Sequence, residues 1–90
     1  MIGPDYNQIP KKSRLAGARA VQKAVSEGKA KEILVAKDAE SKIIAKVLLL
    51  AEERGIKVVW VSGKQQLGEY CGISVGASCC ALLDSTDFKQ

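Results

Sequence analysis

The sequence predicts an α/β fold: a three-layer α/β/α sandwich with a central mixed, largely parallel sheet of about four strands. The first observation behind this prediction is that helix-like and strand-like segments alternate along the 90 residues. That order is typical of a sheet with helices on both faces. The second is that the candidate strands are short, continuously apolar runs, as expected of strands buried on both faces. Because the chain has one Trp, two Tyr and one Phe, its core is expected to consist mainly of Val, Ile, Leu and Ala.

The chain divides into three stretches. Residues 1–12 show no periodicity and are predicted to form a loose N-terminal arm, residues 13–84 a single α/β/α domain, and residues 85–90 a polar C-terminal tail. With 47% hydrophobic and 27% charged residues, the composition is that of an ordinary globular protein. A chain of this length has room for one modest core.

The sequence predicts neither export nor contact with a membrane. The N-terminus lacks the basic start and apolar run of a secretory signal. The longest apolar stretch, residues 47–51, is far shorter than the ~20 residues that cross a bilayer. Three cysteines cannot all pair with one another, and reduced thiols favour a cytoplasmic location.

The N-terminal half of the domain predicts a strand, a helix and a second strand. Residues 15–16 are expected to form a very short edge strand. Over residues 18–27, apolar and charged residues fall on opposite faces at helical spacing, and Gly28 is placed to end this helix. Residues 33–36, with sequence ILVA, are expected to form a strand buried on both faces.

A longer second helix is predicted after this strand. Asp38 is a suitable N-cap for it, and Gly55 is placed to end it. Its apolar stripe consists of Ile43, Ile44, Val47, Leu48 and Ala51.

The last predicted elements are a strand, a short helix and a final strand. Residues 58–61 are expected to form the strand. Ser62 and Gln65 fit the capping box of the short helix, which Gly72 closes. The final strand is expected at about residues 77–83.

The residue types of catalysis are poorly represented. The chain has no histidine, which removes the commonest general base and the usual metal ligand. Adjacent Cys79 and Cys80 would point to opposite faces of a strand, and no Cys-x-x-Cys pair exists, so zinc is not expected. With Cys71, they are interpreted as small buried apolar side chains. We therefore expect no enzyme activity, no metal and no cofactor.

The start of the first helix carries the most informative cluster. Gly17 allows a ligand to approach the backbone, and the free amides of the first turn attract phosphate oxygens. Arg19 and Lys23 project one turn apart on the exposed face beside them. The net charge of +4 suits a polyanionic partner. A solvated basic face on an ordinary helix explains the same residues, and composition alone does not exclude it.

Three motifs in order resemble a known family. GARAVQKA at residues 17–24, VAKDAE at 35–40 and KQQLGEYCG at 64–72 are similar to the kink-turn RNA-binding ribosomal protein family. This family comprises the large-subunit "seven-Ae" and "thirty-e" proteins and their short bacterial relatives. The resemblance covers roughly residues 13–83. It is specific because the three motifs occur together at family spacing.

This resemblance implies an α/β/α sandwich that binds kink-turns, which are RNA duplexes sharply bent at a bulge flanked by sheared G·A pairs. The implied role is that of a ribosomal or ribosome-associated protein that stabilises ribosomal or regulatory RNA, and we expect it to act as a monomer. The RNA-contacting residues implied for this chain are Gly17, Ala18, Arg19, Ala20, Lys23, Lys37, Glu40, Ile44, Lys64, Ile73, Ser74, Val75 and Gly76.

The chain departs from many family members at the first helix. Archaeal and eukaryotic members commonly carry Asn-Glu where this chain has Arg19 and Ala20, and bacterial relatives tend to lack that pair. Ala20 cannot hydrogen-bond a guanine edge, so binding is expected to depend more on phosphates and to weaken more steeply with salt.

Two alternatives stay open. The first is a protein-interaction module without specific RNA binding, since stress-response growth-arrest proteins resemble this architecture. An exposed apolar patch around Ile73 and Val75 would favour it. The second is a catalytic role through the cysteines.

Overall fold

The computed structural model describes residues 4–83 of the chain, so the tail predicted over residues 85–90 lies outside the described residues. The alternation of helices and strands predicted from the sequence is confirmed, including the very short edge strand β1. In chain order the elements are α1 (Pro4–Asn7), the 3-10 helix η1 (Lys11–Ser13), β1 (Arg14–Ala16), α2 (Ala18–Ser26), β2 (Ala30–Ala36), α3 (Ser41–Arg54), β3 (Lys57–Val61), α4 (Lys64–Tyr70) and β4 (Cys79–Leu83).

The four strands form one mixed sheet in the order β1-β4-β2-β3. β4 pairs antiparallel with both β1 and β2, and β2 pairs parallel with β3. The sheet is therefore mixed as predicted, but the expectation that it is largely parallel is wrong. The short α4 agrees with this direction, because its seven residues rise only about 10 Å. A five-residue strand such as β3 spans roughly 17 Å, so α4 alone does not return the chain to the far end of the sheet, and β4 starts at the end where β3 stops.

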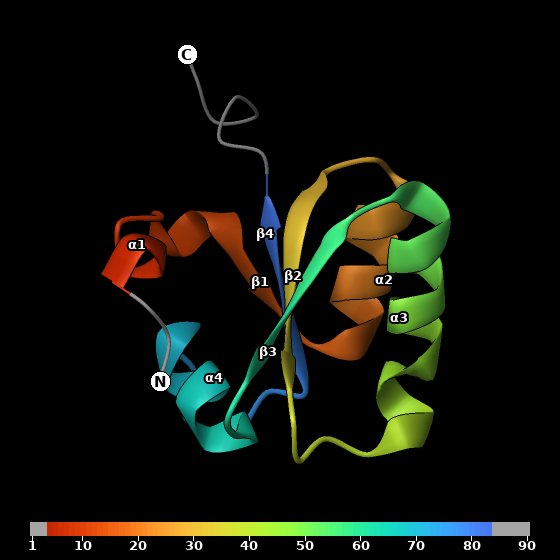
Figure 1. Ribbon diagram of the computed structural model, residues 1–90. Helices are drawn as coiled ribbons and strands as arrows, with labels where there is room; N and C mark the ends of the chain where they lie inside the picture. The colour runs from red at the N-terminus through yellow and green to blue at the C-terminus, as the bar shows by residue number, and fades with distance from the viewer. Residues whose placement is uncertain (1–3, 84–90) are drawn as a thin grey trace.

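Helices cover both faces of the sheet, which confirms the three-layer sandwich (Figure 1). α2 and α3 pack together on one face, and α4 packs on the other. Successive residues of β4 alternate between the faces, so Cys79 lies in the cluster under α2 and α3 and Cys80 in the cluster under α4. The buried side chains of the two clusters taken together are Val, Ile, Leu, Ala and Cys, with Tyr70 in the cluster under α4, as the scarcity of aromatic residues predicted.

The N-terminal segment is not the loose arm predicted over residues 1–12. In its described part, α1 and η1 lie on the same side of the sheet as α4 (Figure 1). The Arg14 guanidinium holds them there by donating to the carbonyls of Ile9 at 2.7 Å and Tyr70 at 2.6 Å. It also lies 3.9 Å from the centre of the Tyr70 ring, and the Tyr70 hydroxyl donates to the Tyr6 carbonyl at 2.6 Å. Local periodicity does not reveal such contacts, because they join residues far apart in the chain.

Two helix caps differ from those predicted. Asp38 does not cap α3; its carboxylate accepts a hydrogen bond of 2.8 Å from the Lys64 amide and so caps α4. The predicted capping box of Ser62 and Gln65 is also wrong, because the Ser62 hydroxyl donates to the side chain of Gln66.

Glycines follow the three longer helices as predicted. Gly55 takes up the left-handed conformation and ends α3, and Gly28 and Gly72 have positive φ after α2 and α4. In the described range, none of the helices combines the length and apolar character that a membrane-spanning segment requires.

Candidate nucleic-acid interface

The starts of α2, α3 and α4 lie together at one end of the sheet. β1, β2 and β3 end at this edge, and β4 starts from it (Figure 1). Backbone hydrogen bonds tie the segments together, since the Gly17 amide donates to the Cys79 carbonyl and the Ala77 amide to the Lys64 carbonyl, both at 3.0 Å. We call this region the candidate edge, and define it as residues 17–20, 37–40, 63–65 and 73–76.

α2 begins at the candidate edge without a side-chain cap from the described residues. Its N-cap, Gly17, has a φ of 104°, a conformation that residues with a Cβ rarely adopt. Its first turn holds no acidic residue, and Arg19 is exposed there. The amides of a first turn carry the partial positive charge of the helix N-terminus. Together with Arg19 they form a turn suited to an anionic group such as a phosphate.

α3 begins at the same edge, again with no side-chain cap donated by the part of the chain that is described. Lys37 and Glu40 are exposed in the connection from β2, and the Lys37 amide donates to the Val61 carbonyl at 2.9 Å. Ile44 is only 6% exposed and lies in the core cluster under α2 and α3. The predicted contact of Ile44 with RNA is therefore wrong, because its side chain belongs to the apolar stripe that packs on the sheet.

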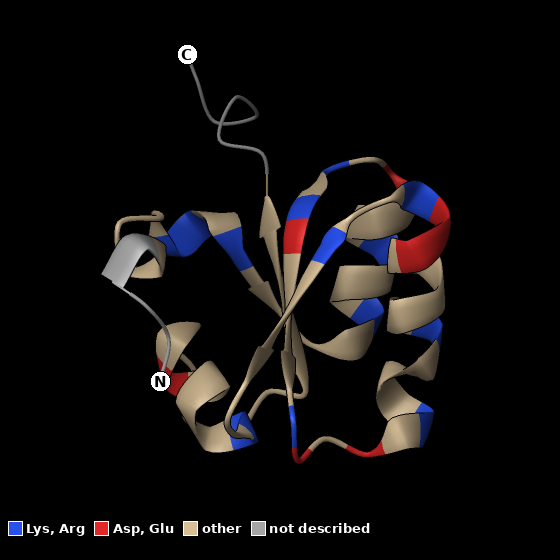
Figure 2. Cartoon of the chain, in the orientation of Figure 1, with Lys and Arg blue, Asp and Glu red and all other residues tan. Residues whose placement is uncertain are grey.

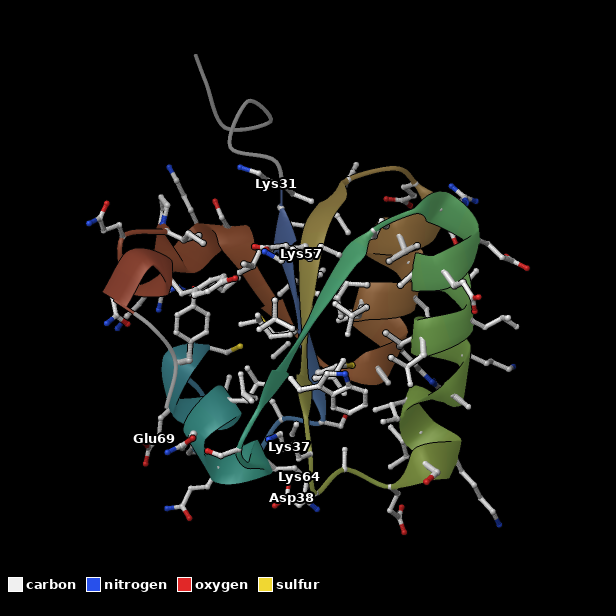
Figure 3. All side chains as sticks on the ribbon, in the orientation of Figure 1. Lys31, Lys37, Asp38, Lys57, Lys64 and Glu69 are labelled. Carbon is white, nitrogen blue, oxygen red and sulfur yellow. The ribbon has the colours of Figure 1, made fainter. Side chains whose placement is uncertain are left out.

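α4 contributes Lys64, whose side chain is exposed. Figure 3 shows Lys37, Asp38 and Lys64 close together at the candidate edge, whereas Lys31 and Lys57 lie at the opposite end of the sheet. The Asp38 cap on the Lys64 amide joins the β2–α3 connection to α4. The candidate edge thus combines Lys37 from the β2–α3 connection and Lys64 from the start of α4 with the carboxylates of Asp38 and Glu40.

The loop of residues 73–76 forms one wall of an open hollow of about 570 Å³ at the candidate edge. Ile73 and Val75 in this loop are 40% and 68% exposed. Apolar side chains beside charged ones suit a planar, partly polar group such as an unstacked base. The hollow is lined by Asp38, Lys64, Gln65, Glu69, Ile73, Ser74, Val75 and Gly76.

The backbone of α4 holds this loop in place. Gly68 is buried in α4, and a Cβ on it would lie 2.2 Å from the Val75 carbonyl oxygen and 3.1 Å from the Gly76 Cα. The loop can approach α4 this closely only because position 68 is glycine. The Ile73 amide also donates to the Gly68 carbonyl at 3.0 Å.

Two predicted site residues of α2 line a second hollow. Ala20 and Lys23 line a separate hollow of about 300 Å³ together with Lys29 and Leu83. Leu83 is the last residue of β4, at the end of the sheet opposite the candidate edge. The structure therefore places Arg19 at the candidate edge, and Lys23 between that edge and the opposite end of the sheet.

Charge alone does not distinguish the candidate edge. Figure 2 shows Lys and Arg at both ends of the sheet and along α2 and α3, with acidic residues among them. What distinguishes this edge is that helix starts, lysines and an exposed apolar loop occur together.

Three residues of the large hollow were not predicted to belong to a site. Gln65 and Glu69 lie one turn apart on α4, so the exposed face of that helix could have indicated them. Asp38 meets Lys64 across 26 positions of sequence, a contact for which no local pattern exists.

Comparisons with known proteins agree on one family. The model of the ribosomal protein L7Ae/L30e/S12e/Gadd45 family matches residues 7–90. An RNA-binding protein of Caldanaerobacter subterraneus is 42% identical over 74 residues, which cover 82% of this chain and 89% of that protein. An RNA-binding protein of Bacillus pumilus is 39% identical over 79 residues, which cover 87% and 96%. The solved structure of a 15.5 kD RNA-binding protein of Giardia lamblia matches with a TM-score of 0.78 and 27% identity, over 88% of this chain and 70% of that one.

The names of these relatives denote RNA-binding proteins, and the family is named for ribosomal proteins, in agreement with the prediction that the chain has no enzyme activity. Within residues 4–83, no group of three or more His, Cys, Asp or Glu side chains is placed to hold a metal ion.

Proposed function

The chain belongs to the ribosomal protein L7Ae/L30e/S12e/Gadd45 family, and from this membership we propose that it binds structured RNA at the candidate edge. The RNA that we propose is the kink-turn, in ribosomal or regulatory RNA, bound by a ribosomal or ribosome-associated protein. The relatives named as RNA-binding proteins align with most of this chain, which supports RNA as the partner. We also propose that it acts as a monomer. Three free thiols support a cytoplasmic location.

The meeting of three helix starts at one edge carries the proposal. Phosphates bind readily at helix N-termini, and within the described residues α2 and α3 receive no side-chain cap that would compete. Arg19 lies in the first turn of α2, and Lys64 is the first residue of α4. A sharp bend brings two stretches of phosphate backbone close to each other. Several anion-binding turns on one edge would therefore stabilise bent RNA more than straight RNA.

The loop of residues 73–76 supplies the second part of the proposed surface. Ile73 and Val75 offer exposed apolar groups beside the large hollow, and a base unstacked at the bulge can pack on such groups. Because a straight duplex presents no unstacked base, this contact also favours the kinked conformer. A protein that binds one conformer better shifts the RNA population towards it.

Base readout at α2 is proposed to be limited. Ala20 has no hydrogen-bonding side chain, whereas the exposed Arg19 can contact phosphates or donate two hydrogen bonds to a guanine edge. Affinity is proposed to depend mainly on phosphate contacts, and therefore to decrease steeply with salt.

A second candidate function is a protein-interaction or regulatory module on the same fold. The exposure of Ile73 and Val75 favours it, because a protein partner would also cover such a loop. The two functions differ in the need for the basic residues of the candidate edge.

The proposal is tested by titrating the protein into a short kink-turn duplex labelled at both ends for energy transfer. The control duplex has its G·A pairs replaced by Watson–Crick pairs. We expect energy transfer to rise with protein only for the kink-turn duplex. Equal binding to both duplexes would reduce the function to that of a general basic surface, and no binding to either would favour the protein-interaction module.

A matched pair of variants locates the binding. Lys64→Ala removes a charge from the candidate edge, and Lys31→Ala removes one from the opposite end of the sheet (Figure 3). We expect K64A to weaken the kink-turn interaction and K31A to leave it close to that of the unmodified chain. The reverse order would place the RNA at the other end of the sheet.

A further inference from the structure

Two of the three cysteines pack on the same core cluster between α4 and β4. Cys80 is fully buried on β4 and packs in the cluster under α4, and Cys71 packs against the same cluster at the end of that helix. Both side chains therefore pack on the same apolar cluster, on the face of the sheet that α4 covers. Cys79 is also fully buried but lies in the cluster on the opposite face of the sheet. The structure thus pairs Cys71 with Cys80 and leaves Cys79 apart.

Cys71 has the features of a reactive thiol. It is partly exposed, so a small reagent can reach it. The hydrogen bond from Cys80 lowers the pKa of Cys71, burial opposes this effect, and the positive charge of Arg14 lowers the pKa further. The Arg14 guanidinium is held in place by the Tyr70 carbonyl at 2.6 Å. Thiolates rather than thiols are the nucleophiles of cysteine chemistry.

Burial raises the pKa of Cys79, and the hydrogen bond to Cys71 together with burial raises that of Cys80. Neither is therefore the first nucleophile. Cys80 instead occupies the position of a resolving thiol beside Cys71.

We propose that Cys71 is a site of oxidation by peroxides and that it then forms an intramolecular disulfide with Cys80. The Cys71 thiolate attacks one oxygen of hydrogen peroxide, the S–O bond forms as the O–O bond breaks, and hydroxide leaves and takes up a proton. The Cys80 thiol then attacks the sulfur of the Cys71 sulfenic acid, and the oxygen leaves as water. In total, two thiols and one peroxide give one disulfide and two waters, and a thiol reductant reverses the reaction.

The disulfide would fix the end of α4 to the central strand β4. Gly72 and the loop of residues 73–76 follow Cys71 directly in the chain. A disulfide between Cys71 and Cys80 reduces the conformational freedom of residues 72–79, which lie between them in the chain. Slower hydrogen exchange of the loop amides is therefore expected in the oxidised protein.

Counting thiols tests the proposal. The reduced chain and three variants, Cys71→Ser, Cys79→Ala and Cys80→Ala, are treated with hydrogen peroxide, unfolded and titrated with Ellman's reagent. The unmodified chain is expected to fall from three free thiols to one, and C79A from two to none, whereas C71S keeps both. In C80A, dimedone is expected to trap a sulfenic acid on Cys71.

A measurement on the unmodified chain guards against variants that fail to fold. A single tryptic peptide, residues 65–89, carries all three cysteines, and its fragmentation identifies which two are joined. Survival of all three thiols, a disulfide that includes Cys79, or oxidation of Cys71 without pairing to Cys80 would each overturn the proposal. Since no readout uses RNA, failure of the RNA-binding proposal leaves this one unaffected.

Discussion

Gly68→Ala tests how the loop of residues 73–76 is held. The added methyl would lie 2.2 Å from the Val75 carbonyl oxygen, whereas real Cβ contacts essentially never fall below 3.0 Å. Either the loop or α4 must therefore move by at least the difference, about 0.8 Å. The obstructing atoms are backbone atoms, so a side-chain rotation cannot relieve the contact.

The expected free energies follow from two opposing effects. Overpacking costs about 1–3 kcal/mol, and alanine in place of glycine in a helix gains about 1 kcal/mol. The free energy of unfolding is therefore expected to fall by only about 0–2 kcal/mol. Loss of a base packed on the displaced loop costs about 1–3 kcal/mol, so kink-turn affinity is expected to fall by about 5- to 150-fold.

The assay compares urea unfolding with kink-turn binding for the unmodified chain, G68A and Gly63→Ala. A Cβ at Gly63 would lie 3.6 Å from the nearest atom, an Asp38 carboxylate oxygen, which is an ordinary contact. G63A thus adds the same methyl at the N-cap of the same helix, within the candidate edge but without a clash, and we expect it to reduce kink-turn affinity less than G68A does. If G68A bound the kink-turn as tightly as G63A, the reasoning that α4 positions a binding loop would be refuted.

Three further changes probe the basic edge and the N-terminal segment. Arg19→Ala is expected to weaken kink-turn binding and to reduce the slope of log affinity against log salt concentration by about one, the contribution of one phosphate contact. Lys29→Ala removes a charge at the other end of the sheet, and we expect it to change neither the affinity nor this slope in the same titrations. Arg14→Lys loses the hydrogen bonds to the Ile9 and Tyr70 carbonyls and is expected to lower the free energy of unfolding by about 1–3 kcal/mol. An unchanged urea midpoint would show that Arg14 does not hold the N-terminal segment in place. Burial raises the pKa of Tyr70 from 10.0 to about 12 against the opposing charge of Arg14. The Tyr70 hydroxyl therefore loses its proton at a lower pH in the unfolded chain than in the folded one, and the free energy of unfolding should decline as the pH rises from 10.0 to about 12. Urea unfolding at stepped pH should show a smaller decline for Tyr70→Phe, and an identical decline would contradict this assignment.

Most of the elements could be predicted because their signals are local. The edge strand at residues 15–16 and the helix over residues 18–27 follow from hydrophobic periodicity and from flanking glycines. The direction of β4 could not be predicted in this way, because it depends on how far α4 reaches across the sheet. The helix that Asp38 caps could not be predicted for a similar reason, since its partner Lys64 is 26 positions away.

The candidate site could be predicted in outline but not in its detail. Motif resemblance indicated Arg19, Lys64 and the loop of residues 73–76, which the structure brings to one edge. The same resemblance included Ile44, which is buried because position 44 lies on the apolar stripe of α3. The role of Gly68 could not be predicted, since it depends on the loop that packs against α4 in the fold.

The claim that structured RNA binds at the candidate edge is tested most directly by mapping the contact on the chain itself. Amide chemical shifts of the isotope-labelled protein are recorded while kink-turn RNA is added. We predict that the largest changes occur at residues 17–20, 37–40, 63–65 and 73–76, with small changes at Lys31 and Lys57. Changes centred on Lys31 and Lys57, or spread evenly over all lysines, would contradict the account.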